Sequence, residues 1–199
     1  LAARQPQLSG YAASKRAGED AVREVLGERV TVLRPPAVYG PGDRETLVFF
    51  QMAGKSIVPL AGTPTARAAM IHVDDLCSLL VALLREAPRG AVLSAADARP
   101  QGYSWREVFG TAARAVGNPR ARLVHAPAAL LRALALGGDV ARLFGVASML
   151  TSEKLRELRH PDWAVPAEEL ARPAGWAPRY ELAEGFAGAV AWYRRAGWL

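Results

Sequence analysis

The chain reads Y-A-A-S-K at residues 11–15 and V-T-V-L-R-P-P-A-V-Y-G-P-G-D at residues 30–43, and these two segments indicate its architecture most directly. Tyr11 and Lys15 are four residues apart, so on a helix their side chains share one face. An ammonium close to a phenol favours the ionised phenol, which suits the pair to proton transfer at an alcohol or a carbonyl. Taken alone, however, this spacing is more typical of an exposed surface pair, because such pairs are ordinary on helices.

The sequence around these segments predicts a helix followed by a buried strand. Residues 13–27 are expected to form the helix. Its apolar side consists of Ala17, Ala21, Val22, Val25 and Leu26. The β-branched run at residues 30–33 is typical of a buried strand. Pro35 and Pro36 should end this strand, because proline cannot donate to a sheet ladder, and residues 40–43 should form a loop.

The remaining pattern predicts an α/β fold. Further helices are expected at residues 45–53, 75–85, 127–136, 151–158 and 182–196, and another should start at Ser104, which forms a capping box with Glu107. Strands are expected at residues 57–60, 69–73, 91–95 and 122–125. Helices and strands alternate as far as residue 95 and helices dominate afterwards, which indicates a parallel-sheet part joined to a smaller, mostly helical part. A doubly wound sheet normally has more central strands than this sequence supplies.

Charge and composition exclude several classes of function. The net charge is +6, yet the 25 Lys and Arg residues are spread along the chain, so nucleic-acid binding is not expected. No apolar run reaches the ~20 residues needed to cross a bilayer, so no membrane partner is expected either. Cys77 is the only cysteine, which excludes an internal disulfide and makes a reducing cytoplasm the default location. His72, His125 and His160 are far apart in sequence and give no metal-ligand spacing.

Two short motifs imitate phosphate-binding loops without their full pattern. The first, residues 40–42, reads G-P-G, but Glu45 stands where a dinucleotide fingerprint needs its third glycine. The second, residues 54–56, reads G-K-S, but Phe49 replaces the first glycine of a P-loop and a strand follows where a helix is required. No G-x-S-x-G segment is present, so a serine hydrolase has no support. We therefore expect none of these three sites.

The segment H-V-D-D at residues 72–75 has a catalytic and a structural interpretation. The structural one is favoured, because Asp is a strong helix N-cap and His72 falls at the end of the expected strand. One of the two aspartates is therefore predicted to cap the helix that follows.

Three motifs together resemble the extended short-chain dehydrogenase/reductases, the NAD-dependent epimerase/dehydratase family. They are the Tyr11/Lys15 pair, R-P-P-A-V-Y-G-P-G-D at residues 34–43 and M-I-H-V-D-D-L at residues 70–76. The segments G-W-A-P at residues 175–178 and W-Y-R-R-A-G-W-L at residues 192–199 are similar to the tail of many bacterial members. The resemblance covers nearly the whole chain, but only the second half of a family member.

The resemblance implies a role for each matching residue and a cofactor, NAD or NADP. Tyr11 would be the general acid/base, and Lys15 would hold the nicotinamide ribose. The loop from Pro35 to Val38 would pass beside the nicotinamide ring, with cofactor contacts from Pro36 and Val38. Ala37 and Arg67 would contact a small-molecule substrate.

The resemblance also implies an organisation in two parts. Residues 1–97 would be the C-terminal part of a partial doubly wound, Rossmann-like dinucleotide-binding domain with a parallel sheet. Residues 98–199 would be a smaller, mostly helical substrate-binding region, to which residues 44–68 contribute. A homodimer through the helix that carries Tyr11 and Lys15 is a further expectation.

Two family features have no counterpart in this sequence. The Gly-rich phosphate loop is absent, and so is the Ser or Thr expected well upstream of the Tyr; Ser9 is too close in sequence to take that place. We therefore expect a piece of an oxidoreductase or epimerase that transfers hydride to or from a sugar nucleotide or another small alcohol or ketone. Ala68 and Ala69 replace the usual neighbours of Arg67, which weakens the sugar-nucleotide alternative. The other alternative is a non-catalytic fragment or interaction module that cannot bind the dinucleotide by itself, so activity of this chain alone is uncertain.

Overall fold

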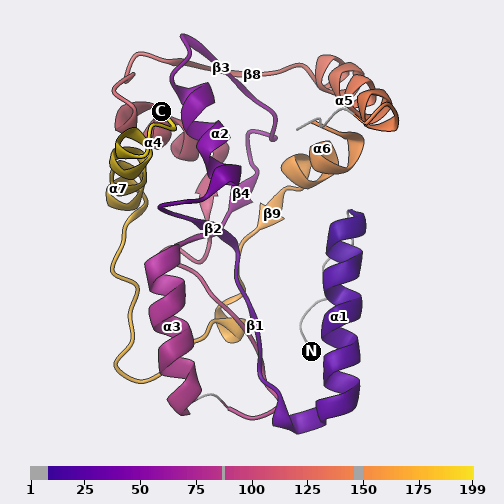
Figure 1. Cartoon of the computed structure of the whole chain (residues 1–199), viewed down its shortest axis with the longest axis vertical. Helices are drawn as coiled ribbons and strands as arrows, with labels where there is room; N and C mark the ends of the chain where they lie inside the picture. Colours follow the sequence, from indigo (N-terminus) through magenta and orange to yellow (C-terminus); the bar gives the residue numbers. More distant parts are fainter. Residues whose placement is uncertain (1–8, 87, 146–149) are drawn as a thin grey trace.

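The computed structural model describes residues 9–86, 88–145 and 150–199 (Figure 1). The α-helices are α1 (Gly10–Leu26), α2 (Arg44–Ala53), α3 (Val73–Glu86), α4 (Trp105–Ala115), α5 (Ala128–Leu143), α6 (Ser152–Arg159) and α7 (Leu182–Arg195). The strands are β1 (Val32–Arg34), β2 (Ala37–Tyr39), β3 (Ile57–Leu60), β4 (Arg67–Ala68), β5 (Met70–His72), β6 (Val92–Ser94), β7 (Tyr103–Ser104), β8 (Arg122–His125) and β9 (Asp162–Trp163). Two 3₁₀ turns, Gly27–Arg29 and Ala167–Glu169, complete the described elements.

The sheet consists of short parallel pieces, which confirms the predicted mixed α/β, Rossmann-like class. β1 pairs with β6 and β2 pairs with β5, both in parallel. Pro35 and Pro36 interrupt the ladder as expected, but the chain then resumes an extended course with a different partner. The predicted loop at Pro35–Val38 is therefore wrong for Ala37 and Val38, which lie within β2. Proline removes a donor only at its own position, so two prolines separate two strands rather than ending the sheet.

A cluster of large side chains joins β2 to the C-terminal helix. Tyr39 is fully buried and meets Phe186 of α7 edge-on, with 5.0 Å between ring centroids. The Tyr193 hydroxyl donates to the backbone carbonyl of Asp43 at 2.6 Å and so fixes the loop after β2. Gly185 is needed for this contact, because a Cβ there would lie 2.5 Å from the Tyr39 hydroxyl oxygen. Figure 1 shows α2, α4 and α7 gathered around this cluster.

The second half of the chain adds two further sheet pieces. β3 pairs with β8 in parallel over four residues each, as the predicted strands at residues 57–60 and 122–125 require. The Ser104–Glu107 capping box is present at the start of α4. A small sheet in the order β7-β4-β9 was not predicted, because its strands are two residues long and carry no periodic pattern.

Helix α1 differs from the other long helices in its packing. None of its residues is buried, so the apolar side predicted for this helix lies open among the described residues. Val25 of this helix has 74% of its surface exposed. In Figure 1, α1 and α3 lie on opposite sides of β1. Within the part of the chain that the structure covers, no helix has both the length and the apolar character to span a bilayer.

Candidate active site

Tyr11 and Lys15 lie in the first turns of α1, on one face as predicted. The Ser9 hydroxyl caps this helix by accepting the backbone N–H of Ala12 at 3.2 Å, which gives Ser9 a structural role. The Lys15 ammonium lies 5.5 Å from the centroid of the Tyr11 ring. Tyr11 is 70% exposed, so its hydroxyl is accessible to a bound molecule. The pair therefore has the spacing and the accessibility that proton transfer needs.

Two sets of charged side chains hold α1 in place. At its start, the Ser9 hydroxyl donates to Glu157 of α6, and the Gly10 N–H donates to Glu153 at 3.3 Å. In its middle, Arg34 at the end of β1 donates two hydrogen bonds to Glu19, at 2.7 and 2.9 Å. The Arg34 guanidinium holds the pKa of the Glu19 carboxyl below its usual range. The helix that carries Tyr11 is thus oriented by polar contacts rather than by a buried face.

A hollow lies at the carboxyl ends of β2 and β5. Its volume is about 330 Å³, and it is lined by Val38 to Asp43 together with Val73. Ligands of open α/β sheets bind outside the carboxyl ends of the strands, so this is the expected position for a bound molecule. Val38, predicted as a cofactor contact, lines the hollow, whereas Pro36 and Ala37 lie at the preceding end of β2. Position 40 in its lining requires glycine, because a Cβ there would lie 2.6 Å from Cγ1 of Val73.

His72 closes β5, as predicted, but the predicted Asp cap is replaced by another arrangement. The His72 ring nitrogen Nδ1 accepts the backbone N–H of Asp74 at 3.2 Å, so the histidine itself serves the start of α3. The ring stacks on Tyr180, with 3.9 Å between centroids, and is almost fully buried. Burial lowers the pKa of His72, and the carboxylates of Asp74 and Asp75 oppose this effect.

Asp75 has a role that the sequence did not indicate. Its carboxylate is fully buried and accepts the backbone N–H groups of Arg179 and Tyr180 at 3.0–3.1 Å. It therefore ties the segment before α7 to the start of α3, which is why it does not act as a helix cap. The segment G-W-A-P at residues 175–178 was the available signal, but its partner could not be read from the sequence.

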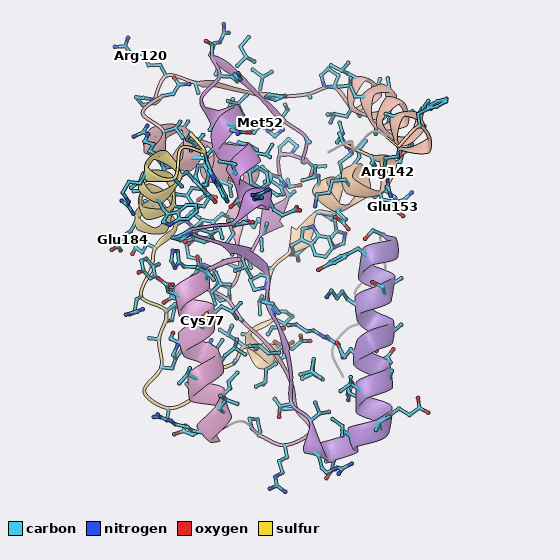
Figure 2. All side chains as sticks on the ribbon, in the orientation of Figure 1. Met52, Cys77, Arg120, Arg142, Glu153 and Glu184 are labelled. Atoms are coloured by element: carbon cyan, nitrogen blue, oxygen red, sulfur yellow. The ribbon has the colours of Figure 1, made fainter. Side chains whose placement is uncertain are left out.

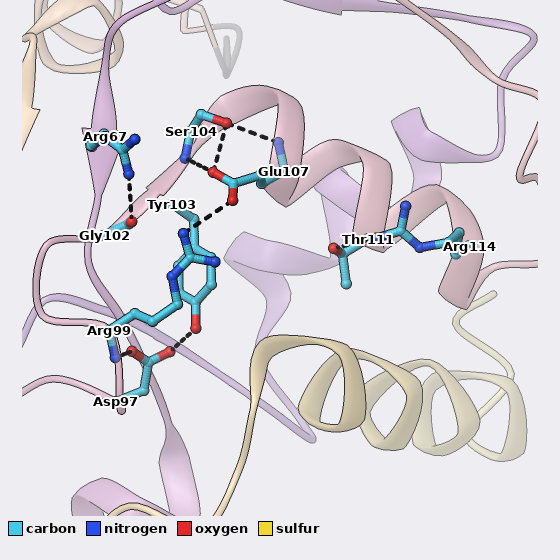
Figure 3. Close-up of polar contacts among 9 residues, drawn as sticks. All are labelled: Arg67, Asp97, Arg99, Gly102, Tyr103, Ser104, Glu107, Thr111 and Arg114. Atoms are coloured by element: carbon cyan, nitrogen blue, oxygen red, sulfur yellow. Dashed lines mark hydrogen bonds and ion pairs between the residues drawn. The ribbon is translucent and has the colours of Figure 1, made fainter.

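Arg67 lies in β4, apart from the hollow. Figure 3 shows its guanidinium donating to the carbonyl oxygen of Gly102, at 3.3 Å. In the same region, the Tyr103 hydroxyl donates to Asp97 at 2.7 Å, and Arg99 contacts both the Tyr103 ring and Glu107. Burial raises the pKa of Asp97 and of Tyr103. This cluster borders a second hollow of about 470 Å³, and sequence analysis did not single it out.

The structure gathers only part of the predicted site. Tyr11 and Lys15 contact one another on α1, Val38 lines the hollow, and Arg67 lies on another sheet piece. In the described ranges, no three metal-ligating side chains come together. The residues that the sequence missed, Asp75 and His72 in its capping role, position the strands and helices that border the hollow.

The fold and the site define a class: a Rossmann-like α/β protein with an exposed Tyr-x-x-x-Lys pair and a hollow at the carboxyl edge of its parallel strands. Residues 2–96 match the model of the NAD dependent epimerase/dehydratase family, which confirms the resemblance drawn from the motifs. The cofactor that this resemblance carries is NAD(P).

Comparisons with individual proteins and solved structures agree with this fold. The chain is 44% identical over 200 residues to a protein of Caulobacter vibrioides named ceramide reductase, a match that covers 100% of this chain and 62% of the relative. A dTDP-glucose 4,6-dehydratase from Streptomyces venezuelae, solved with NAD, has a TM-score of 0.64 and 22% identity, covering 98% of this chain and 53% of its own. A UDP-glucuronic acid 4-epimerase from Bacillus cereus, solved with its sugar nucleotide and NAD, has a TM-score of 0.63 and 15% identity, covering 95% and 54%. The chain thus spans less than two thirds of each.

Proposed function

We propose that this chain is part of an NAD(P)-dependent oxidoreductase that interconverts a ketone and an alcohol on a lipid of the ceramide type. The exposed Tyr11 with Lys15 beside it is the observation that carries the proposal. The substrate class is supported by the 44% identity to a ceramide reductase over the whole chain.

Tyr11 would exchange a proton with the oxygen of the reacting carbon. The phenol donates during reduction, and the Lys15 ammonium stabilises the phenolate that forms. When bound, the nicotinamide supplies or accepts the hydride at that carbon. Pro36 and Val38 would border its ring, since Val38 lines the hollow at the strand ends.

The residues present fit one end of the cofactor. The Lys15 ammonium carries three donors that a ribose hydroxyl could accept, and the hollow lies where the carboxyl ends of β2 and β5 meet. The pyrophosphate end has no counterpart here, because this sequence contains no Gly-rich phosphate loop. We therefore expect tight dinucleotide binding from a form extended at its N-terminus and weak binding from these residues alone.

A sugar nucleotide is the less favoured substrate. The Arg67 guanidinium would have to hold the diphosphate, but it donates to the carbonyl of Gly102, which precedes β7 of the same sheet. Ala37, the other predicted substrate contact, lies on β2 and offers no side-chain donor. Neither position therefore supports a diphosphate site, which agrees with the lipid class.

The deciding experiment replaces Tyr11 by Phe in an N-terminally extended form. Reduction of a short-chain keto analogue of ceramide is followed by the loss of NADH or NADPH absorbance. We expect kcat to fall by roughly 10²-fold or more, because the variant lacks the group that delivers the proton. Glu24→Gln, an exposed position more than three turns further along the same helix, is the control and should keep its activity.

Calorimetric titration with NAD(H) and NADP(H) separates the alternatives. Cofactor binding that survives in Tyr11→Phe while turnover is lost supports the proposed role of Tyr11. Turnover that survives the substitution contradicts it. Absence of cofactor binding from both the extended form and this chain would favour the non-catalytic alternative.

A further inference from the structure

Helix α5 presents an apolar face that nothing in the described structure covers. Its exposed large side chains are Leu130, Leu134, Leu136 and Val140, and Phe144, the residue that follows the helix, has 80% of its surface exposed. At 3.6 residues per turn these side chains, with the small residues between them, occupy an arc of roughly 160°. The arc contains no charged residue, although charged side chains usually occupy the outer face of a surface helix.

The opposite face anchors α5 to the rest of the protein. Leu131 and Ala135 are buried against Leu155 of α6. Figure 1 places α5 at the periphery of the molecule next to α6, and Figure 2 shows its outer side chains projecting outwards. The exposed apolar face therefore does not belong to a helix that fails to pack, because the inner face of α5 is packed against α6.

The charge that borders this face is basic. Arg132 lies just outside the apolar arc and is exposed, whereas Arg142 falls on the inner side of the helix. Asp139 is the acidic residue of the helix, and its carboxylate accepts the backbone N–H of Ser152 at 3.1 Å, so it serves the start of α6. The charge at the edge of the apolar face is thus positive, and the chain as a whole carries a net charge of +6; together they complement an anionic surface.

We propose that α5 is a membrane-docking helix that inserts its apolar face into the interface of a bilayer containing anionic lipids. An amphipathic helix of this kind lies in the interface plane, with its apolar side among the acyl chains and, here, Arg132 at the headgroups. The proposal rests in part on the proposed lipid substrate, because a ceramide-type lipid resides in a bilayer. It replaces the expectation of no membrane partner, which was drawn from the absence of a spanning segment alone.

Helices α1 and α3 also expose apolar side chains but fit this role less well. The exposed Val22 and Val25 of α1 alternate with Arg23 and Glu24. Leu80 and Leu84 of α3 are exposed as well, but α3 packs directly on β2 and β5. In a doubly wound sheet, helices and further strands lie around helices that flank the central strands, as α1 and α3 flank β1. Helix α5 instead lies at the periphery beside α6.

The test is flotation with lipid vesicles, which does not depend on catalysis. The vesicles are phosphatidylcholine with and without phosphatidylglycerol, and the protein is this chain and its extended form. Leu130→Glu/Leu134→Glu places two charges in the proposed face. The matched control is Leu80→Glu/Leu84→Glu, which changes two exposed leucines of the same spacing on α3. Circular dichroism verifies that both variants are folded.

We expect the unmodified protein to float with the anionic vesicles and to bind the neutral vesicles more weakly. The α5 variant should bind about tenfold more weakly or worse, since each 1.4 kcal/mol lost corresponds to a factor of ten. The α3 variant should bind as the unmodified protein does. Equal losses in both variants, or no vesicle binding by the unmodified protein, would overturn the proposal.

Two further measurements separate this proposal from its alternatives. If α5 instead covers a second copy of the chain, light scattering will show a change of oligomeric state in the α5 variant without any vesicle binding to lose, which overturns membrane docking. Turnover of a water-soluble short-chain substrate is expected to be unchanged in the α5 variant. Vesicle binding without any turnover would therefore contradict the proposed function while leaving α5 as a membrane-docking helix.

Discussion

At the scale of single residues, close contacts explain why particular buried positions do not tolerate substitution. Gly185 lies against the Tyr39 ring, and His72 lies between the Tyr39 and Tyr180 rings. Neither contact could be predicted from the sequence, because each joins residues far apart in the chain. The Tyr11/Lys15 spacing could be predicted, because it depends only on the period of one helix.

We predict that Gly185→Ala destabilises the protein by roughly 1–3 kcal/mol, because the added methyl group would overpack a buried contact with Tyr39. The matched control is Gly188→Ala in the same helix, where a Cβ meets nothing within 4 Å. That change should raise the free energy of unfolding by up to about 1 kcal/mol, through helix propensity. Urea unfolding measures both, and equal effects would contradict the explanation.

A second prediction concerns His72 and pH. Its pKa is lowered in the folded state by burial, so on acidification the unfolded chain takes up the proton first. The stability that His72 contributes is therefore present above the unfolded pKa of about 6.5 and is lost as the pH falls towards the lower folded pKa. His72→Asn keeps an acceptor for the Asp74 N–H without titrating in this range. The variant should show a flatter decrease of unfolding free energy between about pH 7.5 and 5.5, and an unchanged decrease would contradict the assignment.

At the scale of elements, the predictable parts were those set by local pattern. The strands at residues 57–60 and 122–125 and the capping box of α4 matched the structure, because alternation and caps act within a few residues. Strands β4, β7 and β9 were missed, since two residues carry no period and pair only in the tertiary fold. Helix α5 runs to Leu143 rather than ending at residue 136, because it continues through Gly137 and Gly138, which sequence reasoning treats as a stop.

Helix α1 supplies a prediction at this scale. Arg34→Lys removes the paired hydrogen bonds to Glu19, because a lysine ammonium cannot reproduce the planar fork of a guanidinium. We expect a loss of about 1 kcal/mol, because both side chains are partly buried. Hydrogen exchange should accelerate in α1 while β3 and β8 keep their protection. Uniform acceleration over the whole chain would contradict a local role for this ion pair.

At the scale of the whole molecule, hydrogen bonds between residues far apart in sequence connect the N-terminal and C-terminal halves of the chain. Asp75 binds the segment before α7, and Tyr193 binds the loop after β2. The division at residue 97 stays a prediction, and the core cluster crosses it, since Tyr39 and Met70 pack with Phe186 and Val190. Sequence patterns predict which elements form, but not which of them share a core.

Asp75→Ala tests these connections. The substitution leaves the backbone N–H groups of Arg179 and Tyr180 without their acceptor, and we expect a loss of roughly 2–3 kcal/mol. Asp74→Ala removes an exposed carboxylate one residue away and should cost much less. Thermal unfolding gives both values, and limited proteolysis should show faster cleavage near residues 172–180 only in Asp75→Ala.

The contact between Ser9 and Glu157 also bears on the order in which the protein is made. These residues are 148 positions apart, and Gly10 finds its partner Glu153 at a separation of 143. On the ribosome, the start of α1 therefore emerges long before the carboxylates that hold it. The proposed proton donor can reach its final orientation only after α6 has been synthesised and packed, so orienting Tyr11 is expected to be among the last steps of folding.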